Sequence, residues 1–272
     1  MAKKKYLIGL DPEIFIKDEN NKLDSAIGLF GGTKSDPIDI GKGCAIQEDN
    51  ILVEFNTPPT DDYDTFLDNI NYCKSYIETV LAGQGKELHY SSSEKVTEDL
   101  LKDDKSREFG CAPSYNVVTE EVSEVNVESM HEDQYLTRSS GFHVHIGYEN
   151  PTQEFNDRLV LCFELMVTLP LLEADIDNHN RRLLYGKLGD SREKEYGVEC
   201  RSLGGSLLRN DDLIKQVWDG VHNAIKLAEE SEYTEEELRS FILYCIDDQN
   251  NIKKESVNDV LQELKIKKLQ TV

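Results

Sequence analysis

The sequence is short of positive charge, which limits the partners that the chain can have. It holds 30 Lys and Arg residues against 53 Asp and Glu residues, so its formal net charge is −23 at pH 7. A chain this acidic repels the phosphates of nucleic acids and anionic membrane surfaces, because binding to either relies on clustered cations. We therefore expect neither a nucleic-acid partner nor a membrane partner.

Cysteine pairs at metal-binding or redox spacing are absent, and so are long apolar runs. The six cysteines contain no CxxC pair, and no secretory signal precedes them. The longest apolar stretch, residues 159–172, is interrupted by Glu164, Thr168 and Pro170, and it is too short to cross a bilayer. These absences predict a cytoplasmic protein with reduced thiols.

The order of sequence patterns predicts a mixed fold. Residues 6–57 alternate short β-like runs with Gly, Asn and Pro turns, which indicates a hairpin-rich sheet. Residues 62–81 place apolar side chains at helical spacing, and the pattern is all-helical from Asn210. No repeat or low-complexity linker marks a boundary. The sequence therefore favours an α+β domain at 1–209 with a helical C-terminal extension, 210–272, packed on it.

Four strand-like segments carry reactive side chains at every second position. The pairs are Asp11 and Glu13, Glu54 and Asn56, His143 and His145, and Glu199 and Arg201. Side chains two apart on a strand point to the same face, so each pair lies on one surface. Oxygen ligands outnumber nitrogen and no thiolate joins them, which favours magnesium or manganese. A zinc site on the two histidines and one carboxylate stays open, as does an ordinary solvated sheet face.

A basic stretch interrupts this acidic sequence shortly before the Glu199 segment. Residues 181–187, RRLLYGK, include Arg181, Arg182 and Lys187. Guanidinium and ammonium groups concentrated in this way suit phosphate oxygens. The alternative is a basic helix end that balances the acidic surface.

Taken in order, these motifs resemble those of the phage-encoded COOH–NH2 ligases of type 2, relatives of glutamine synthetase and of glutamate–cysteine ligase. The motifs are GLDPE at 9–13, SAIG at 25–28, QEDN at 47–50, EFN at 54–56, FGC at 109–111, GFHVHIG at 141–147, RRLLYGK at 181–187 and YGVECR at 196–201. The resemblance covers residues 6–208. The ordered set carries it, not any one motif. The family pattern leads us to expect an aromatic residue at Cys200 and a small one at Leu188, so packing near these positions departs from it.

The resemblance implies a glutamine-synthetase-like fold, in which a curved, mainly antiparallel sheet carries helices on one face and residues 1–209 form the catalytic domain. It implies an ATP-dependent carboxylate–amine ligase that forms an amide or peptide-type bond through an acyl phosphate. The cofactors would be ATP and Mg²⁺, with Mn²⁺ as the alternative. Substrates would be small-molecule or peptide carboxylates and amines, and a phage-encoded enzyme would act in the host cytoplasm. A homo-oligomer is left open.

Rival functions remain at this point. A phosphotransferase of the guanidino-kinase type would have the same general fold and would use divalent metal ions in the same way, without forming an amide. A catalytically silent binding or virion-associated protein would keep the fold alone, and metal-dependent hydrolysis is a further rival.

The resemblance also implies roles for individual residues. The implied metal ligands are Asp11, Glu13, Glu48, Glu54, His143 and Glu199. The residues implied to bind the nucleotide are His145, Lys187, Tyr185 and Arg138. The residues implied to contact the transferring phosphoryl group are Arg201, Arg181 and Arg182.

Overall fold

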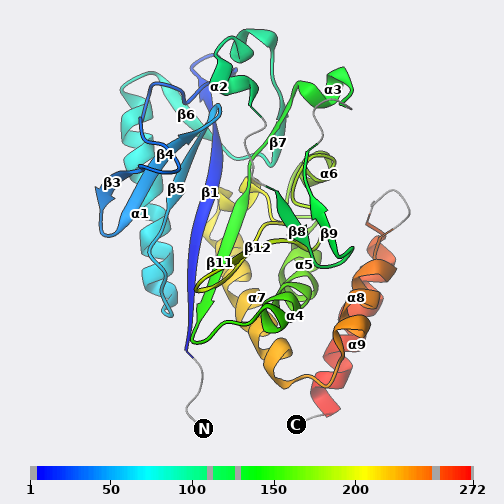
Figure 1. Cartoon of the computed structure of the whole chain (residues 1–272). Helices are drawn as coiled ribbons and strands as arrows, with labels where there is room; N and C mark the ends of the chain where they lie inside the picture. Colours follow the sequence, from blue (N-terminus) through cyan, green and yellow to red (C-terminus); the bar gives the residue numbers. More distant parts are fainter. Residues whose placement is uncertain (1–4, 109–112, 126–129, 247–251, 271–272) are drawn as a thin grey trace.

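A long strand, β1 (Tyr6–Asp18), crosses the middle of the sheet (Figure 1). The computed structural model describes residues 5–108, 113–125, 130–246 and 252–270. Among the short β-like runs expected within residues 6–57, the sequence pattern separates residues 6–10 from residues 13–16, on either side of Pro12. The structure has one strand instead, and Pro12 lies where the pairing of β1 passes from β11 to β5. The FGC motif at 109–111 lies outside the described residues.

The sheet is antiparallel at every pairing recorded in the described part of the chain. Its eleven strands run in the order β3-β4-β5-β1-β11-β13-β12-β8-β9, with β2 and β6 also paired to β1. The bounds are β2 (Leu23–Asp24), β3 (Ile38–Gly41), β4 (Cys44–Asp49), β5 (Leu52–Asn56), β6 (Lys86–His89), β8 (Ser114–Asn116), β9 (Glu121–Ser123), β11 (Phe142–Tyr148), β12 (Asp190–Lys194) and β13 (Gly197–Cys200). A separate pair joins β7 (Ser93–Lys95) to β10 (Thr137–Ser139).

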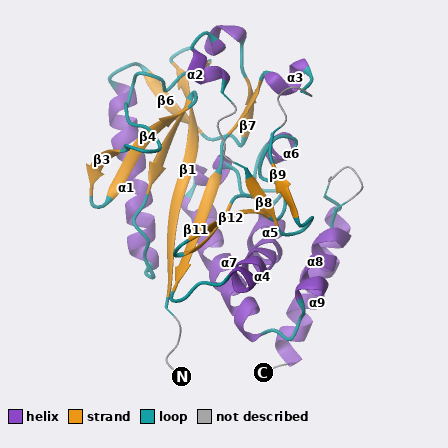
Figure 2. Cartoon of the chain, in the orientation of Figure 1, coloured by secondary structure: helices purple, strands orange, loops and turns teal. Residues whose placement is uncertain are grey.

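Helices cover one face of this sheet (Figure 2). The main ones are α1 (Tyr63–Ala82), α4 (Gln153–Phe163) and α7 (Asp211–Glu230). The shorter helical segments are η1 (Glu98–Leu101), α2 (Asp104–Arg107), α3 (Glu132–Tyr135), the π-helical η3 (Glu164–Thr168), α5 (Leu169–Leu171), α6 (Asn178–Arg182), η4 (Gly205–Arg209), α8 (Glu235–Tyr244) and α9 (Lys254–Gln270). Of these, η1 and α3 pack with Phe15 in a second, smaller apolar cluster. The α+β class with a large antiparallel sheet, predicted from the sequence, is confirmed.

The helices form where the sequence predicts them because each begins at a capping residue and buries an apolar face. Asp62 caps α1 by accepting the N–H of Thr65, and the face from Phe66 to Leu81 is buried on the sheet. The predicted all-helical region begins at Asn210, which caps α7 in the same way. Trp218 of α7 packs on Phe66 with ring centroids 4.7 Å apart. The C-terminal helices thus share a core with the sheet, while the boundary at 209/210 remains a prediction.

The two faces of the sheet differ in chemistry. Side chains of β1 and β11 that point toward the helices are apolar and buried, among them Ile8, Leu10, Ile14, Val144 and Ile146. Their neighbours point to the opposite face and carry the polar pairs. All cysteines in the described ranges are buried and free; Cys111 lies outside those ranges. No helix in the described part is long and apolar enough to span a membrane.

Candidate active site

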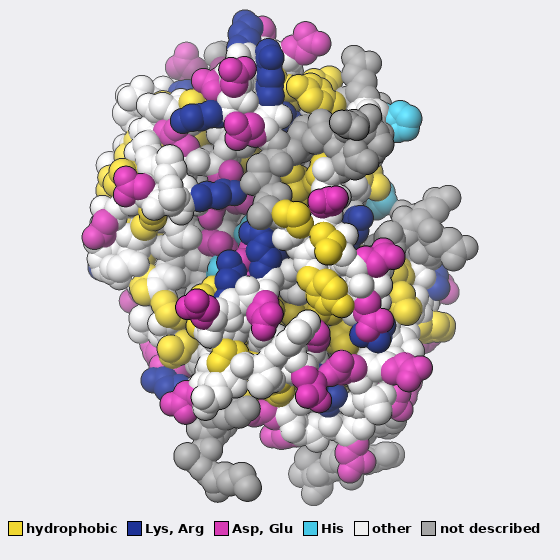
Figure 3. Space-filling view, in the orientation of Figure 1, with side chains coloured by type: hydrophobic (Ala, Val, Ile, Leu, Met, Phe, Trp, Pro, Cys, Tyr) yellow, Lys and Arg dark blue, Asp and Glu magenta, His cyan; other side chains and the backbone are white. Residues whose placement is uncertain are grey.

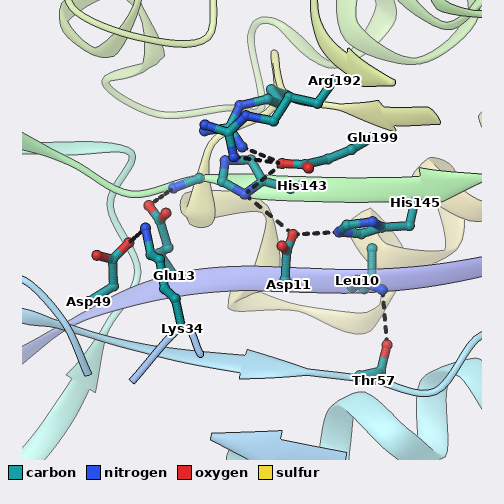
Figure 4. Close-up of polar contacts among 12 residues, drawn as sticks. Leu10, Asp11, Glu13, Lys34, Asp49, Thr57, His143, His145, Arg192 and Glu199 are labelled. Carbon is teal, nitrogen blue, oxygen red and sulfur yellow. Dashed lines mark hydrogen bonds and ion pairs between the residues drawn. The ribbon is translucent and has the colours of Figure 1, made fainter. Parts of the chain in front are cut away.

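Register between neighbouring strands assembles the candidate site on the polar face (Figure 4). The cross-strand partners are Asp11 with His143, Glu13 with Glu54, and His145 with Glu199. Directly opposed residues of antiparallel strands have their side chains on the same face and close together. Segments nearly two hundred positions apart in the sequence therefore present one continuous polar surface.

The first acidic group lies where β1, β11 and β13 meet. Its members are Asp11, His145 and Glu199, whose ligand atoms lie within 4.8 Å of one another. Nε2 of His145 is 2.9 Å from Oδ1 of Asp11, and Nζ of Lys194 is 2.7 Å from Oε2 of Glu199. Burial raises the pKa of Asp11. The charge of His143 and hydrogen bonds from both histidines together outweigh burial, so the pKa of Asp11 lies well below its usual range. Asp11 is therefore ionised and ready to ligate a cation.

The second acidic group lies between β1, β4 and β5. Its members are Glu13, Asp49 and Glu54, again within 4.8 Å of one another. The backbone N–H of Gly141 donates to Glu13 over 2.7 Å. Burial, then the charge of Glu13, raises the pKa of Asp49 to about 6, and burial with neighbouring carboxylates raises the pKa of Glu54 well above its usual value. Crowded carboxylates of this kind favour a cation between them.

Glu48 is not brought into either group. Its Oε1 accepts the backbone N–H of Phe30 over 3.0 Å and of Gly31 over 2.7 Å. Along β4, Gln47 pairs with Glu54, so alternation places Asp49 on the site face and Glu48 on the other. The structure therefore does not bring Glu48, one of the expected metal ligands, to the acidic groups, and Asp49 lies there instead. The sequence offered two adjacent carboxylates, and the register of β4 with β5 decides between them.

The two histidines of β11 both face Asp11, but in different ways. The resemblance assigns the metal to His143, whereas the first acidic group contains a ring nitrogen of His145. Nδ1 of His143 lies 3.3 Å from Asp11 and 3.9 Å from Glu199. Burial, and then the nearby charge of Arg201, lowers the pKa of His143. A Cβ on Gly141 would lie 2.3 Å from Nε2 of His143, so only glycine fits beside it.

Arg201 lies beside the first acidic group and is held there by another arginine. Its Nη1 forms an ion pair with Oε1 of Glu199. Arg181 is buried and donates to the backbone carbonyl oxygens of Arg201 (2.9 Å) and Ser202 (3.2 Å). Gly186 has φ +63°, and a Cβ there would lie 1.5 Å from Nη1 of Arg181. Arg181 thus supports the backbone that carries Arg201.

The other residues expected to bind the nucleotide or the phosphoryl group differ in whether they lie near the polar face. Arg182 lies near Asp175 and lines neither hollow described below, because neighbours on a helix point about 100° apart. Lys187 also lines neither hollow. Arg138 and Tyr185 do line one, although the Arg138 guanidinium donates to three backbone carbonyls. The structure therefore does not bring Arg182 and Lys187 to the polar face with Arg201.

Two hollows flank the acidic groups. A cleft of about 460 Å³ opens beside His145, and its lining includes Gly9, Gly147, Pro59 and Tyr196. The hydroxyl of Tyr196 bonds to Nδ1 of His145, a contact that the sequence did not suggest. A smaller cavity of about 50 Å³ adjoins the second acidic group; among its lining residues are Glu13, Asp49, His143, Arg138, Arg181, Arg201 and Tyr185. Figure 3 shows Lys and Arg side chains gathered over β11 and β12 in the middle of this face, with acidic side chains around them.

Comparison with known proteins assigns a family. The sequence profile of the phage phiEco32-like COOH–NH2 ligases of type 2 matches residues 112–265. The chain belongs to this ligase family. The match contains His143, His145, Glu199 and Arg201, while Asp11 and the other carboxylates of β1, β4 and β5 precede it. It also runs through the C-terminal helices, beyond residue 208, where the recognisable motifs end.

A further comparison is with solved structures. A bifunctional glutathione synthetase from Pasteurella multocida has a similar structure, with 13% sequence identity and a TM-score of 0.46. The alignment covers 96% of this chain and 47% of that protein, so the chain spans less than half of the length of that protein. No curated protein sequence matches.

Proposed function

We propose that the protein is an ATP-dependent carboxylate–amine ligase that forms an amide or peptide-type bond through an acyl phosphate. Family membership supports the class of reaction. The observation that carries the rest is the presence of two acidic groups on one sheet face. Asp11 and Glu13 stand two residues apart on β1, about 7 Å along the strand, so one chain of phosphates can lie across both groups. A glutamine-synthetase-like arrangement of the sheet is part of this proposal.

The donor atoms fit divalent cations of the Mg²⁺ or Mn²⁺ type. Each group offers three ligand atoms within 4.8 Å, and together they comprise five carboxylates and one imidazole. Oxygen-rich sets suit Mg²⁺ and Mn²⁺, whereas structural zinc prefers sites with more nitrogen or sulfur. Bound divalent ions would offset the negative charge of the triphosphate and of the phosphoryl group in transfer. We assign Asp11, His145 and Glu199 to one ion and Glu13, Asp49 and Glu54 to the other.

The reaction needs no protein nucleophile. A carboxylate oxygen of the acid attacks the γ-phosphorus of ATP, and ADP leaves. The amine then attacks the acyl carbon, inorganic phosphate leaves, and the amine nitrogen releases a proton. Arg201 is placed to contact equatorial oxygens of the transferring phosphoryl group, because its guanidinium lies beside Glu199 and lines the cavity next to Glu13.

The two hollows suit the two kinds of substrate. The cleft beside His145 has glycines 9 and 147 in its lining and is mainly apolar, as a nucleoside requires. The smaller cavity has Arg138, Arg181 and Arg201 in its lining, and this concentration of positive charge suits a carboxylate. We therefore place the nucleoside beside His145 and the acid beside Arg201, with the phosphates between them.

A hydroxamate assay tests this function. Hydroxylamine replaces the amine, and candidate acids are screened with Mg²⁺ and ATP. We expect hydroxamate and ADP in equal amounts. Glu54→Gln should be inactive, whereas Glu87→Gln, an exposed carboxylate on β6, should match the unaltered protein. ADP formed together with a phosphorylated guanidine or amine, and without hydroxamate, would identify a phosphotransferase instead.

A further inference from the structure

The loop before β3 is fastened to β4 by the carboxylate that stays outside the acidic groups. Glu48 accepts the backbone N–H groups of Phe30 and Gly31. Gly32 follows with φ +79°, and a Cβ there would lie 2.9 Å from the carbonyl oxygen of Ile46 in β4. The glycine is needed for both the left-handed backbone and the close approach. The loop is therefore held tightly against the strand that carries Asp49.

A short turn at the end of this loop presents one lysine. Thr33 and Asp36 exchange two backbone hydrogen bonds of 3.0 Å, which closes the turn around Lys34. Nζ of Lys34 lies 3.0 Å from Oδ2 of Asp49. Figure 4 shows the amine between the carboxylates of Asp49 and Glu13, and its charge also helps to lower the pKa of Glu13 against the effect of burial.

We propose that Lys34 is a tethered cation that occupies the entrance of the second acidic group and competes with the divalent ion for Glu13 and Asp49. This inference rests on the proposed function, since it assigns a metal ion to that group. Lys34 would stabilise the metal-free protein and weaken the affinity of this group for metal. The first acidic group, formed by Asp11, His145 and Glu199, would keep its own affinity.

The charges and exposures support a displaceable contact. Glu13 and Glu54 are buried, and Asp49 is about four-fifths shielded from solvent, so their mutual repulsion is poorly screened. The Lys34 side chain is half exposed, with 51% of its surface accessible. An ammonium on a flexible stem brings one charge and no fixed geometry. A divalent ion brings two charges and can contact all three carboxylates at once, so it can replace Lys34 when it enters.

Titration calorimetry with MnCl₂ alone, without nucleotide, tests the competition. Lys34→Met keeps the length of the side chain and removes the charge, while Lys34→Arg keeps a cation. We expect Lys34→Met to bind manganese at the second group about fivefold more tightly, because the metal no longer has to displace a partly exposed ion pair. Lys34→Arg should bind like the unaltered protein. In EDTA, Lys34→Met should melt a few degrees lower, because the repulsion is then uncompensated.

The control variant is Lys226→Met, which removes another lysine–carboxylate pair, with Glu230 of α7, on the far side of the core. It should leave manganese affinity unchanged. If Lys34→Met and the unaltered protein bind manganese equally at both groups, Lys34 does not compete and only this inference is lost. If no variant binds manganese at all, the metal assignment of the proposed function fails as well.

Discussion

Glu164 makes the stability of the protein depend on pH in a way that can be measured. It lies at the start of η3 and is fully buried. Burial raises its pKa to about 7, and the nearby polar groups of Gly189, Ser202 and Thr168 offset only part of that effect. In the unfolded chain the value returns to about 4.5. Between these values the folded protein binds more protons than the unfolded chain, so its stability falls as pH rises through that window.

The magnitude follows from the two pKa values. One pKa unit corresponds to about 1.4 kcal/mol, so the contribution of Glu164 should fall by about 2 to 3 kcal/mol between pH 5 and pH 8. Glu164→Gln keeps the shape but cannot ionise. We expect the difference in unfolding free energy between this variant and the unaltered protein to change by that amount, with the variant relatively more stable at pH 8.

Urea unfolding followed by circular dichroism at pH 5, 6, 7 and 8 provides the measurement. Comparing the two proteins at each pH cancels the titration of all other groups. Parallel stability profiles would refute the reasoning. They would mean that Glu164 stays ionised in the folded protein, with Arg182 as its counter-charge, because each of these residues lies within the electrostatic reach of the other.

Three further predictions concern the site. Glu54→Ala should abolish ligation yet melt no lower than the unaltered protein in EDTA, because it relieves repulsion within the second acidic group; a large drop in melting temperature would mark Glu54 as structural. Arg201→Lys should lower the rate of acyl-phosphate formation on the order of a hundredfold, with little change in ATP affinity, and single-turnover ADP release would show it; a normal rate would remove Arg201 from the mechanism. Gly186→Ala should lower both stability and activity because it displaces Arg181, whereas Gly28→Ala, at φ +81° with open space around it, measures the backbone strain alone; equal losses would show that the Arg181 contact is unimportant.

Periodicity was enough to predict the strands that carry the site and the helices that cover the sheet. Alternation along 142–148 placed His143 and His145 on one face, and the helical spacing of 62–81 predicted α1 to within a residue at each end. These are local properties, since side-chain direction follows directly from backbone geometry. Strand ends were less certain, and the predicted break at Pro12 was wrong because long-range pairing on both sides of β1 continues the strand past it.

The choice among neighbouring polar residues needed more than periodicity. Glu48 and Asp49 are adjacent carboxylates in β4, and only the register with β5 shows which one meets Glu54. Arg181 and Arg182 are adjacent in the same way, and the packing of α6 turns the first toward Arg201 and the second away.

The sequence by itself determined the α+β class, the polar face of the sheet and the kinds of side chain on that face, because these depend on composition and on the two-residue repeat of a strand. Only the tertiary structure decided how these side chains divide into two groups, that Arg181 supports Arg201, and that Lys34 reaches Asp49. These contacts join residues from separate elements, and their distances are determined by strand register, loop closure and helix packing. No pattern within one segment contains that information.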